Sequence, residues 1–503
     1  MELSDPATVS TVSTGIPGLD HILGGGLPAG RLYLVEGAPG SGKTTLALQF
    51  LLSAPASEST LYITLSETAE ELRGVARSHG WGLDGIELFE LAQAEQALGA
   101  DREQSVLHPW EVELGETVSL ITAKVEQASP ARVVFDSLSE MRLLAQDPLR
   151  YRRQVLALKQ YFATRRITVL LVDDMTGSGG ERDSHLHSLC HGVITLERLT
   201  LDFGAARRRL EVQKMRGVDF RGGYHDMRMQ RGGLVVYPRL IASEFHTPYA
   251  GDPTPSGVIE LDAMLNGGPL RGTTALILGP AGSGKTNLAL QYIGAACRRG
   301  ERAVVYEFDE RIGTLLLRAQ AMGLDVHAHM RDGLLYIRQI DPAEISPGEF
   351  ASMVKCEVEE NGTRLFLIDS LVGYMAAMPQ EQQLLLQMHE LLAYLNQQGV
   401  LTLLINSQHS LVGSMSAAGL NISYISDAVL LLRFFESGGR VRKALSVIKN
   451  RGGPHEDTIR ELRIDSRGVR IGAVLSDFHG VLTGVPEYVG SMEALLGDRV
   501  HGK

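Results

Sequence analysis

Two glycine-rich segments of this sequence have the residues needed to bind the phosphates of a nucleotide. Residues 37–44 read GAPGSGKT and residues 279–286 read GPAGSGKT, and both fit the P-loop pattern GxxxxGK[ST]. The glycines of such a loop allow backbone N–H groups to surround phosphate oxygens, and the following helix adds the positive end of its dipole. Lys43 and Lys285 would reach the outer phosphates. We therefore expect ATP to bind two matching sets of residues, Gly37, Gly40, Ser41, Gly42, Lys43 and Thr44 in the first segment and Gly279, Gly282, Ser283, Gly284, Lys285 and Thr286 in the second.

Groups that could hold Mg²⁺ occur at equivalent places in both halves of the chain. The P-loop threonines, Thr44 and Thr286, are of the type whose hydroxyl binds the metal ion. Asp136 and Asp369 each end an apolar run and are each followed by Ser and Leu. An acid at that point can hold the hydration shell of the metal ion, although an acid after a strand is also often a helix cap. Because both halves have the acid at the same place, we predict a metal-binding role for Asp136 and Asp369.

Catalysis also needs a base that orients water or accepts a hydroxyl proton. Candidate carboxylates follow the second strand-like run of each half. The repeat pairs Glu67 with Glu310 and Ser66 with Asp309, so the two halves differ in their acid–base groups. Acids at such a place also cap helices or occupy their first turns. We expect Glu67, Asp309 and Glu310 to be catalytic.

The elements that must position these groups are present twice, because the two halves of the chain resemble each other. Residues 14–20 match residues 256–262, and residues 37–49 match residues 279–291 without a gap. Prolines mark a linker near residues 237–255. We predict an N-terminal domain at 1–240, a C-terminal domain at 250–486, and a short tail at 487–503.

Each half alternates apolar runs with helical patterns, which is typical of parallel sheets covered by helices. The expected strands are residues 32–36, 132–135 and 168–172 in the first half and residues 274–278, 365–368 and 401–405 in the second. The predicted fold class is α/β, with two tandem RecA-like P-loop domains, each a mainly parallel sheet flanked by helices. The sequence alone does not give the strand order.

Composition excludes several classes of protein. A formal net charge of −11 argues against a dedicated nucleic-acid binder, and the basic run at residues 206–209 fits a solvated strand or helix end. Cys190, Cys297 and Cys356 lie far apart, which suits a reducing cytosol and neither a disulfide framework nor a zinc site. The sequence shows no signal peptide at Met1 and no apolar stretch of membrane-spanning length, so we expect a cytoplasmic protein without membrane attachment.

Two further motifs are repeated, KMRG at 214–217 and KNRG at 449–452. Together with the P-loops they make the sequence resemble the KaiC family, the double-domain RecA-superfamily ATPases and autokinases of the circadian clock, from about Thr14 to about Pro486. This resemblance implies an ATP-dependent homo-hexamer with ATP at subunit interfaces. It also implies that one group of cations reaches the ATP of the neighbouring subunit, as an arginine finger does: Lys214, Arg216, Lys449 and Arg451. His455 corresponds to a family histidine near the nucleotide, and Phe220 replaces it in the first half.

The resemblance further implies an N-terminal ATPase ring and a C-terminal ring that phosphorylates itself. Of the family's two phosphorylated residues, the serine corresponds to Ser423, whereas the threonine is replaced by Tyr424. Treating this segment as extended, in which neighbouring side chains point to opposite faces, we expect Ser423 to be the phosphorylation site and Tyr424 at most a minor one.

The family has two adjacent glutamates in each domain, and here the first of them is replaced by Ser66 in the N-terminal domain and by Asp309 in the C-terminal domain. The loss of a carboxylate at Ser66 predicts slow hydrolysis at the N-terminal site. The tail after residue 486 differs from that of the clock protein, so binding of KaiA is not expected. The resemblance implies a KaiB-like partner on the N-terminal ring. The predicted function is ATP binding and hydrolysis with Ser/Thr autokinase activity in the C-terminal domain, as a KaiC-like signalling switch. The alternatives are a RecA-like DNA-acting ATPase and a nucleotide-held scaffold with little turnover.

Overall fold

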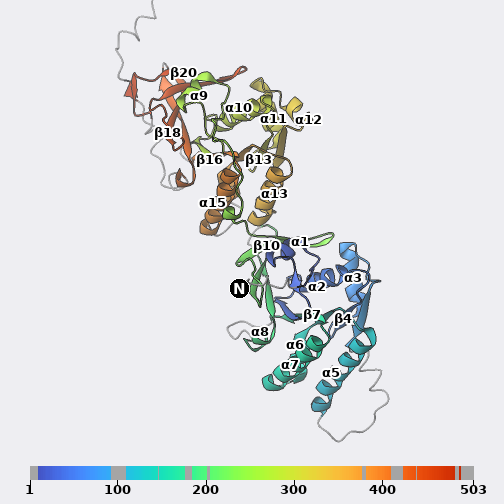
Figure 1. Cartoon of the computed structure of the whole chain (residues 1–503). Helices are drawn as coiled ribbons and strands as arrows, with labels where there is room; N and C mark the ends of the chain where they lie inside the picture. Colours follow the sequence, from blue (N-terminus) through green and yellow to red (C-terminus); the bar gives the residue numbers. More distant parts are fainter. Residues whose placement is uncertain are drawn as a thin grey trace, which may run out of the picture. The chain divides into compact units, whose positions relative to one another are not determined.

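The computed structural model describes residues 10–91, 109–145, 147–175, 184–200, 204–375, 381–408, 423–437, 439–481 and 487–488. The chain divides into two compact units, Met1–Arg239 and Leu240–Lys503. Each unit contains a nine-stranded sheet with helices on both sides (Figure 1). The predicted fold class, two tandem α/β domains with mainly parallel sheets, is confirmed.

In the first unit the sheet order is β11-β10-β9-β8-β3-β7-β6-β4-β5, and the strands from β8 to β5 run parallel. The strands are β3 (Leu32–Gly37), β4 (Thr60–Thr64), β5 (Ile86–Glu90), β6 (Arg132–Asp136), β7 (Thr168–Asp174), β8 (Gly192–Leu199), β9 (Arg207–Met215), β10 (Tyr224–Gln230) and β11 (Gly233–Tyr237), with a separate pair β1 (Thr11–Val12) and β2 (Leu27–Pro28). The helices are α1 (Pro17–Ile22), α2 (Lys43–Leu52), α3 (Ala69–His79), α5 (Pro109–Ala128), α6 (Leu138–Ala145), α7 (Pro148–Thr164) and α8 (Ser184–Leu189).

The second unit repeats this order as β14-β13-β15-β16-β12-β17-β18-β19-β20, parallel from β14 to β17. The strands are β12 (Thr274–Pro280), β13 (Ala303–Glu307), β14 (Leu335–Gln339), β15 (Leu365–Asp369), β16 (Leu401–Gln408), β17 (Ala428–Ser437), β18 (Arg440–Asn450), β19 (Arg460–Asp465) and β20 (Gly468–Val474), with a separate pair β21 (Phe478–His479) and β22 (Glu487–Tyr488). The helices are η1 (Ala242–Glu244), α9 (Ile259–Met264), α10 (Lys285–Arg298), α11 (Ile312–Ala321), α12 (Val326–Arg331), α13 (Pro347–Glu359), α14 (Leu371–Met375), α15 (Glu381–Gln397) and η2 (Ser423–Ile425).

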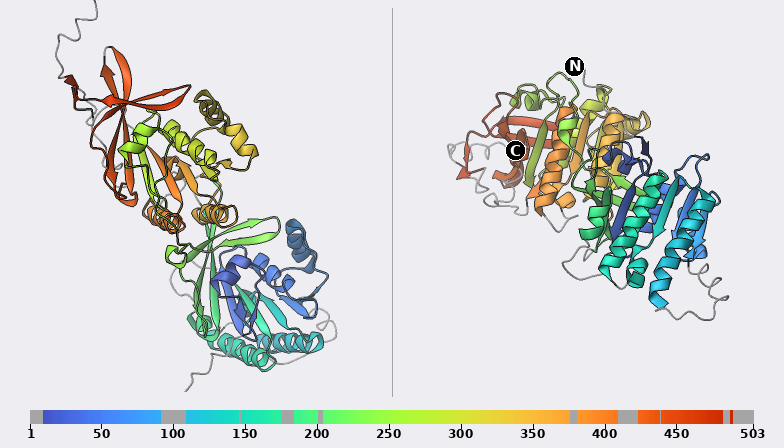
Figure 2. Two further views of the ribbon diagram at one scale, coloured as in Figure 1. Left: turned by 45° about the horizontal axis from the view of Figure 1, so that its top comes forward. Right: turned by 60° about the horizontal axis from the view of Figure 1, so that its bottom comes forward.

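The central strands are apolar on both faces, because helices cover both. In β3, Tyr33 and Val35 join one buried cluster with residues of α2, while Leu32 and Leu34 join another with residues of α5, α6 and α7. Figures 1 and 2 show these helices on opposite sides of the sheet. Two similar clusters cover the faces of the second sheet. Strands such as β3 are therefore apolar along their whole length because both of their faces are buried under helices, as the sequence predicted.

Helix ends follow local capping chemistry. Thr68 caps α3 in a capping box with Glu71, and Gly80 ends the same helix in a left-handed conformation. Ser346 caps α13 ahead of Pro347. The turn between β4 and α3, which carries Glu67, is therefore fixed at its helix end by the Thr68 cap.

Candidate nucleotide sites at the two P-loops

Both glycine-rich loops lie between the central strand of a sheet and a helix, β3–α2 and β12–α10. At both helix starts, Gly42 and Gly284 take left-handed conformations, and neither helix start has a side-chain cap within the described part of the chain. The first N–H groups of α2 and α10 are therefore available to an anion. The hydroxyls of Ser41 and Ser283 are buried and have no hydrogen-bond partner among the described residues. These features fit a bound triphosphate.

The backbone approaches closely at the first glycine of each loop. A Cβ atom on Gly37 would lie 2.3 Å from the carbonyl oxygen of Leu196, and one on Gly279 would lie 2.7 Å from that of Leu432. Any larger residue would push the loop away from the neighbouring strand. The glycines are thus needed for packing as well as for phosphate binding.

The two P-loop lysines have different surroundings. Lys43 Nζ donates to the carbonyls of Gly37 and Ala38 and forms an ion pair with Asp174 at 2.7 Å. Lys285 Nζ donates to the carbonyl of Pro280 at 2.9 Å. Asp174 was not predicted from the sequence, although it is the second of two acids that follow the predicted strand at residues 168–172. Asp174 lies opposite Gly37 in the sheet register. In the second half, the residue opposite Gly279 is a serine.

Asp136 and Asp369 lie at the ends of β6 and β15, on the same edge of each sheet as the P-loops. Thr286 Oγ1 donates to Asp369 at 2.7 Å, which brings the two predicted metal ligands of the second half together. In the first half Tyr62 donates to Asp136 at 2.5 Å. Burial raises the pKa of both carboxyls, and these hydrogen bonds oppose the rise. Each threonine–aspartate set offers oxygen ligands of the kind that Mg²⁺ prefers.

The acidic loop of the first half places Glu67 beside this metal-binding edge. Burial, and then the negative charge of Asp136, raise the pKa of Glu67 to about 7. One of its carboxylate oxygens is buried without a partner among the described residues. The helix-capping role is filled by Thr68, so Glu67 is not needed for it. A carboxyl with a pKa near neutrality is well suited to act as a general base.

The acidic loop of the second half is arranged differently. Glu310 forms an ion pair with Arg318 at 2.5 Å, and Asp309, which is exposed, accepts a hydrogen bond from Ser370. A third carboxyl, Glu307, is 1% exposed and lies opposite Asp369 in the sheet register. Burial, followed by the charge of Asp369, raises its pKa. Sequence reasoning missed Glu307 because a polar residue at the end of a strand is common.

The Lys-x-Arg elements lie at the other end of each sheet. Lys214 pairs in register with Val193 near the start of β8, and its ammonium group donates to the carbonyls of His187 and Cys190. Lys449 lies at the equivalent place, paired with Val429 and donating to the carbonyl of Ser426 at 2.5 Å. The amino ends of these strands face away from the P-loop of the same unit, which lies at the carboxyl ends.

The arginines of these elements lie beside the lysines. Arg216 donates to the carbonyl of Ser188 at 2.9 Å, and Arg451 lies 3.9 Å from Asp427 and is 58% exposed. Burial and then the neighbouring arginine lower the pKa of both Lys214 and Lys449. A bound anion would relieve this repulsion between like charges.

The predicted phosphorylation segment lies on the same edge as Lys449. Ser423 begins the 3₁₀ turn η2, and its side chain lies outside the described residues; Tyr424 is 55% exposed. The expectation of an extended segment is wrong, because a 3₁₀ turn rotates successive side chains by about 120° instead of alternating them. His455 is exposed in the turn after β18.

The sequence did not predict a polar contact between Glu36 and His187 beside the first P-loop. Glu36, which directly precedes Gly37, accepts a hydrogen bond from Thr195 and lies 2.9 Å from His187 Nε2. No sequence pattern predicts this contact, because the partners come from three separate elements. It links the first P-loop strand to the helix whose last carbonyls bind Lys214 and Arg216.

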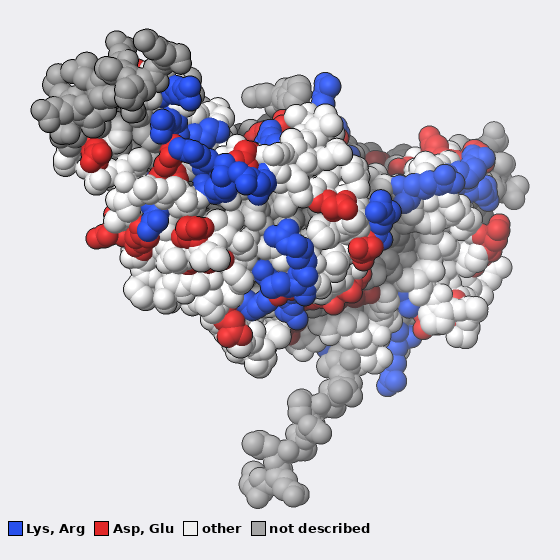
Figure 3. All heavy atoms as spheres, turned by 90° about the horizontal axis from the view of Figure 1, so that it is seen from above, with Lys and Arg blue, Asp and Glu red and all other residues white. Residues whose placement is uncertain are grey.

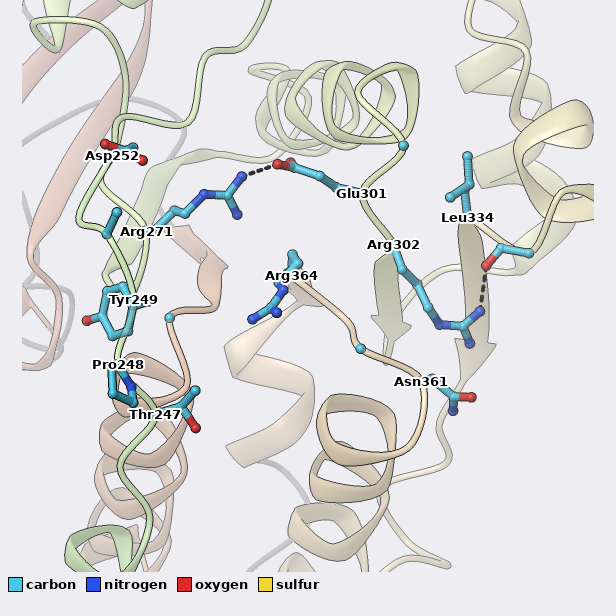
Figure 4. Close-up of a pocket in the computed structure, with 15 residues that line it drawn as sticks. Thr247, Pro248, Tyr249, Asp252, Arg271, Glu301, Arg302, Leu334, Asn361 and Arg364 are labelled. Atoms are coloured by element: carbon cyan, nitrogen blue, oxygen red, sulfur yellow. Dashed lines mark hydrogen bonds and ion pairs between the residues drawn. The ribbon is translucent and has the colours of Figure 1, made fainter.

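A depression of about 720 Å³ lies in the second unit, at the amino ends of β12, β13 and β15 (Figure 4). Arg271 reaches Glu301 across it, and Arg302 donates to the carbonyl of Gly333 at 2.6 Å and pairs with Glu357. Two of the three arginines that line it are therefore paired with glutamates within the chain, whereas Arg364 contacts the carbonyl of Gln398. It lies at the opposite end of the sheet from the P-loop.

On the face drawn in Figure 3, basic side chains form several bands, with acidic side chains among and beside them. In the second unit Arg442 and Arg463 pair with Glu461, and Arg470 pairs with Asp465. In the first unit Arg209 pairs with Glu197 and lies over the ring of Tyr224. These pairs reduce the positive charge that a nucleic-acid backbone would need.

Comparison with known proteins decides the family. A family model described as "ATPase: KaiC" matches residues 12–241 and again residues 254–476. The chain belongs to the KaiC family. The circadian clock protein KaiC3 of Synechocystis is 27% identical over 495 residues, covering 96% of each chain. The circadian clock oscillator protein KaiC of Synechococcus elongatus is 28% identical over 495 residues, covering 96% of this chain and 93% of the relative.

As a KaiC-family member, the protein carries two ATPase domains, and each contains one of the P-loops described above. The predicted nucleotide-binding class is therefore confirmed at the level of the family. Within the residues that the structure describes, no helix has the length and apolar character needed to span a membrane.

Proposed function

We propose that the protein hydrolyses ATP in both domains and transfers phosphate to its own C-terminal domain, acting as a KaiC-like signalling switch. The observation that carries this proposal is that each unit has a P-loop at one edge of the sheet and a Lys-x-Arg element at the other. A single unit cannot bring its own two edges together, whereas equivalent units of neighbouring copies in a ring can. Homo-hexamer formation in the presence of ATP is therefore part of the proposal.

Nucleotide would be held by the P-loop residues, and Mg²⁺ by Thr44 with Asp136 and by Thr286 with Asp369. The metal ion, when bound, supplies charge neutralisation at the phosphates. Lys43 and Lys285 stabilise negative charge on the phosphate oxygens, and Lys214, Arg216, Lys449 and Arg451 do so from the next subunit. His455 would lie near the nucleotide of the second domain.

The base is assigned separately in each domain. Glu67 orients water at the N-terminal site, where Ser66 supplies no carboxylate. In the C-terminal domain Asp309 or Glu310 accepts the proton of the acceptor hydroxyl, for which Ser423 is preferred over Tyr424. The location of Tyr424 at the same sheet edge as Lys449 supports transfer between neighbouring chains.

The remaining assignments belong to the same proposal. The domains extend over residues 1–240 and 250–486, followed by a tail at 487–503. The protein is cytoplasmic, which its three unpaired cysteines support. Its protein partner is KaiB-like and not KaiA, and nucleic acid is not a ligand.

Incubation with ATP labelled at the γ-phosphate, followed by mass-spectrometric mapping, tests the proposal. Lys43→Ala should lower hydrolysis while label still enters the C-terminal domain. Lys285→Ala should abolish labelling while part of the hydrolysis remains. Labelling that is lost equally in a Lys43→Ala protein that still assembles would contradict the division of roles.

A further inference from the structure

The acidic loops of the two halves are fixed in the same way by different residues. In the first half Thr64, the last residue of β4, lies opposite Asp136 in the sheet register. In the second half Glu307, the last residue of β13, lies opposite Asp369. Both side chains are 1% exposed, in strands whose other residues are almost all apolar. A polar group at this buried position needs a hydrogen-bond partner.

The partner is the backbone of the candidate base in both halves. Thr64 Oγ1 accepts the N–H of Glu67 at 3.0 Å and donates to its carbonyl at 2.7 Å. Glu307 Oε1 accepts the N–H of Glu310 at 2.9 Å. A hydroxyl and a carboxyl thus make the same contact at the same place in the repeat.

The start of each acidic loop is fixed as well. The N–H of Leu65 donates to the carbonyl of Asp136 at 2.8 Å, and the N–H of Phe308 donates to that of Asp369 at 2.7 Å. The loop is thereby held at its start against the strand that carries the metal-binding acid, and at the candidate base against the last residue of the adjacent strand, β4 or β13. Since Glu67 and Glu310 follow directly, their distance from the metal-binding edge depends on these contacts.

We propose that Thr64 and Glu307 are positioning residues for the catalytic carboxylates, each holding the backbone of the acidic loop at its own ATP site. This inference rests on the proposed function, because it takes Glu67 and Glu310 as candidate bases. Neither residue needs to touch the nucleotide. We call the hydrogen bond between each of these residues and the backbone of the candidate base the tether. Removing the tether should lower the rate of the chemical step and leave nucleotide affinity almost unchanged.

The test for the first half uses a Lys285→Ala background, so that only the N-terminal site turns over. Thr64→Val removes the hydroxyl at nearly constant size, and Thr64→Ser keeps it. We expect Thr64→Val to lower kcat for ATP about tenfold with KM within twofold of the parent, and Thr64→Ser to recover most of the rate. A loss of kcat that Thr64→Ser does not recover would mean a packing effect and would overturn the proposal.

The matched test for the second half uses a Lys43→Ala background and measures phosphate incorporation. Glu307→Gln and Glu307→Thr keep an acceptor for the Glu310 N–H, whereas Glu307→Leu does not. We expect about tenfold slower incorporation in Glu307→Leu and near-parental rates in the other two variants. Equal rates in all three would overturn the tether in this half.

One further variant separates the tether from the proposal on which it rests. Glu67→Gln removes the candidate base and leaves the Thr64 contacts with the backbone in place. If Glu67→Gln loses hydrolysis and Thr64→Val does not, the tether is wrong and the base assignment stands. If Glu67→Gln keeps full hydrolysis, the base assignment itself is wrong, and the positioning role of Thr64 is refuted as well.

Discussion

Hydrolysis at the N-terminal site should depend on pH through Glu67. A general base must be ionised to accept a proton, and burial together with the charge of Asp136 raises the pKa of Glu67 to about 7. With that pKa, about one tenth of the carboxyl is ionised at pH 6 and about nine tenths at pH 8. The rate should therefore fall about tenfold as the pH decreases from 8 to 6. A glutamate with the ordinary value of 4.5 would be almost fully ionised across this range.

The assay is ADP release by a Lys285→Ala protein at saturating ATP, with assembly checked at each pH. Glu67→Gln should lower the rate by about 10²–10⁴-fold and remove this pH dependence. Glu70→Gln is the matched control, because Glu70 is exposed on the adjacent helix and pairs only with the exposed Arg77 among the described residues. A flat rate between pH 6 and 8, or a Glu67→Gln protein with the parental rate, would refute the assignment of Glu67 as the base.

Three further outcomes are expected. Light scattering should show a particle of about six chains with ATP and Mg²⁺ and smaller species after the nucleotide is removed, because ligand at an interface stabilises the assembled state; a monomer at saturating ATP would contradict this. Ser423→Ala should remove most of the incorporated phosphate and Tyr424→Phe little of it, as measured by phosphopeptide mapping, whereas dominant phosphotyrosine at 424 would reverse the assignment. Phe350→Ala should lower the free energy of unfolding of the C-terminal unit by about 3–5 kcal/mol in urea titrations, because this ring is fully buried against Tyr306, Phe308 and Tyr374; a loss below about 1 kcal/mol would be inconsistent with that packing.

The sequence predicted the fold through features that depend on local physics. Apolar runs such as residues 168–172 predict buried parallel strands because helices must cover both faces of the sheet, and β7 confirms this one with two more residues at its end. The P-loops were recognisable because a tight phosphate-binding turn requires glycines at fixed positions. Strand order, by contrast, depends on contacts between distant segments, and no local pattern specifies it.

The candidate site was predictable only in part, for the same reason. Tyr62 and Glu36 find their partners on other elements, so their contacts with Asp136 and His187 have no sequence signature. Asp174 did have a signal, because it belongs to a pair of acids that follows a predicted strand. The conformation at Ser423 was predicted wrongly, because a family pattern of residue types contains no information on whether the backbone is extended or a 3₁₀ turn.

Each C-terminal site should be completed by a neighbouring chain, and mixed assemblies test this dependence. One chain carries Lys285→Ala, which disables its P-loop but keeps its Lys449 edge. The other carries Lys449→Ala with Arg451→Ala, which keeps the P-loop but disables the edge, and the two chains are distinguished by a tag. Neither protein alone should be labelled by γ-phosphate-labelled ATP. The mixture should regain labelling, and the label should be found on the Lys285→Ala chain. Full labelling of the Lys449→Ala, Arg451→Ala protein by itself, or a mixed assembly without label, would contradict the account.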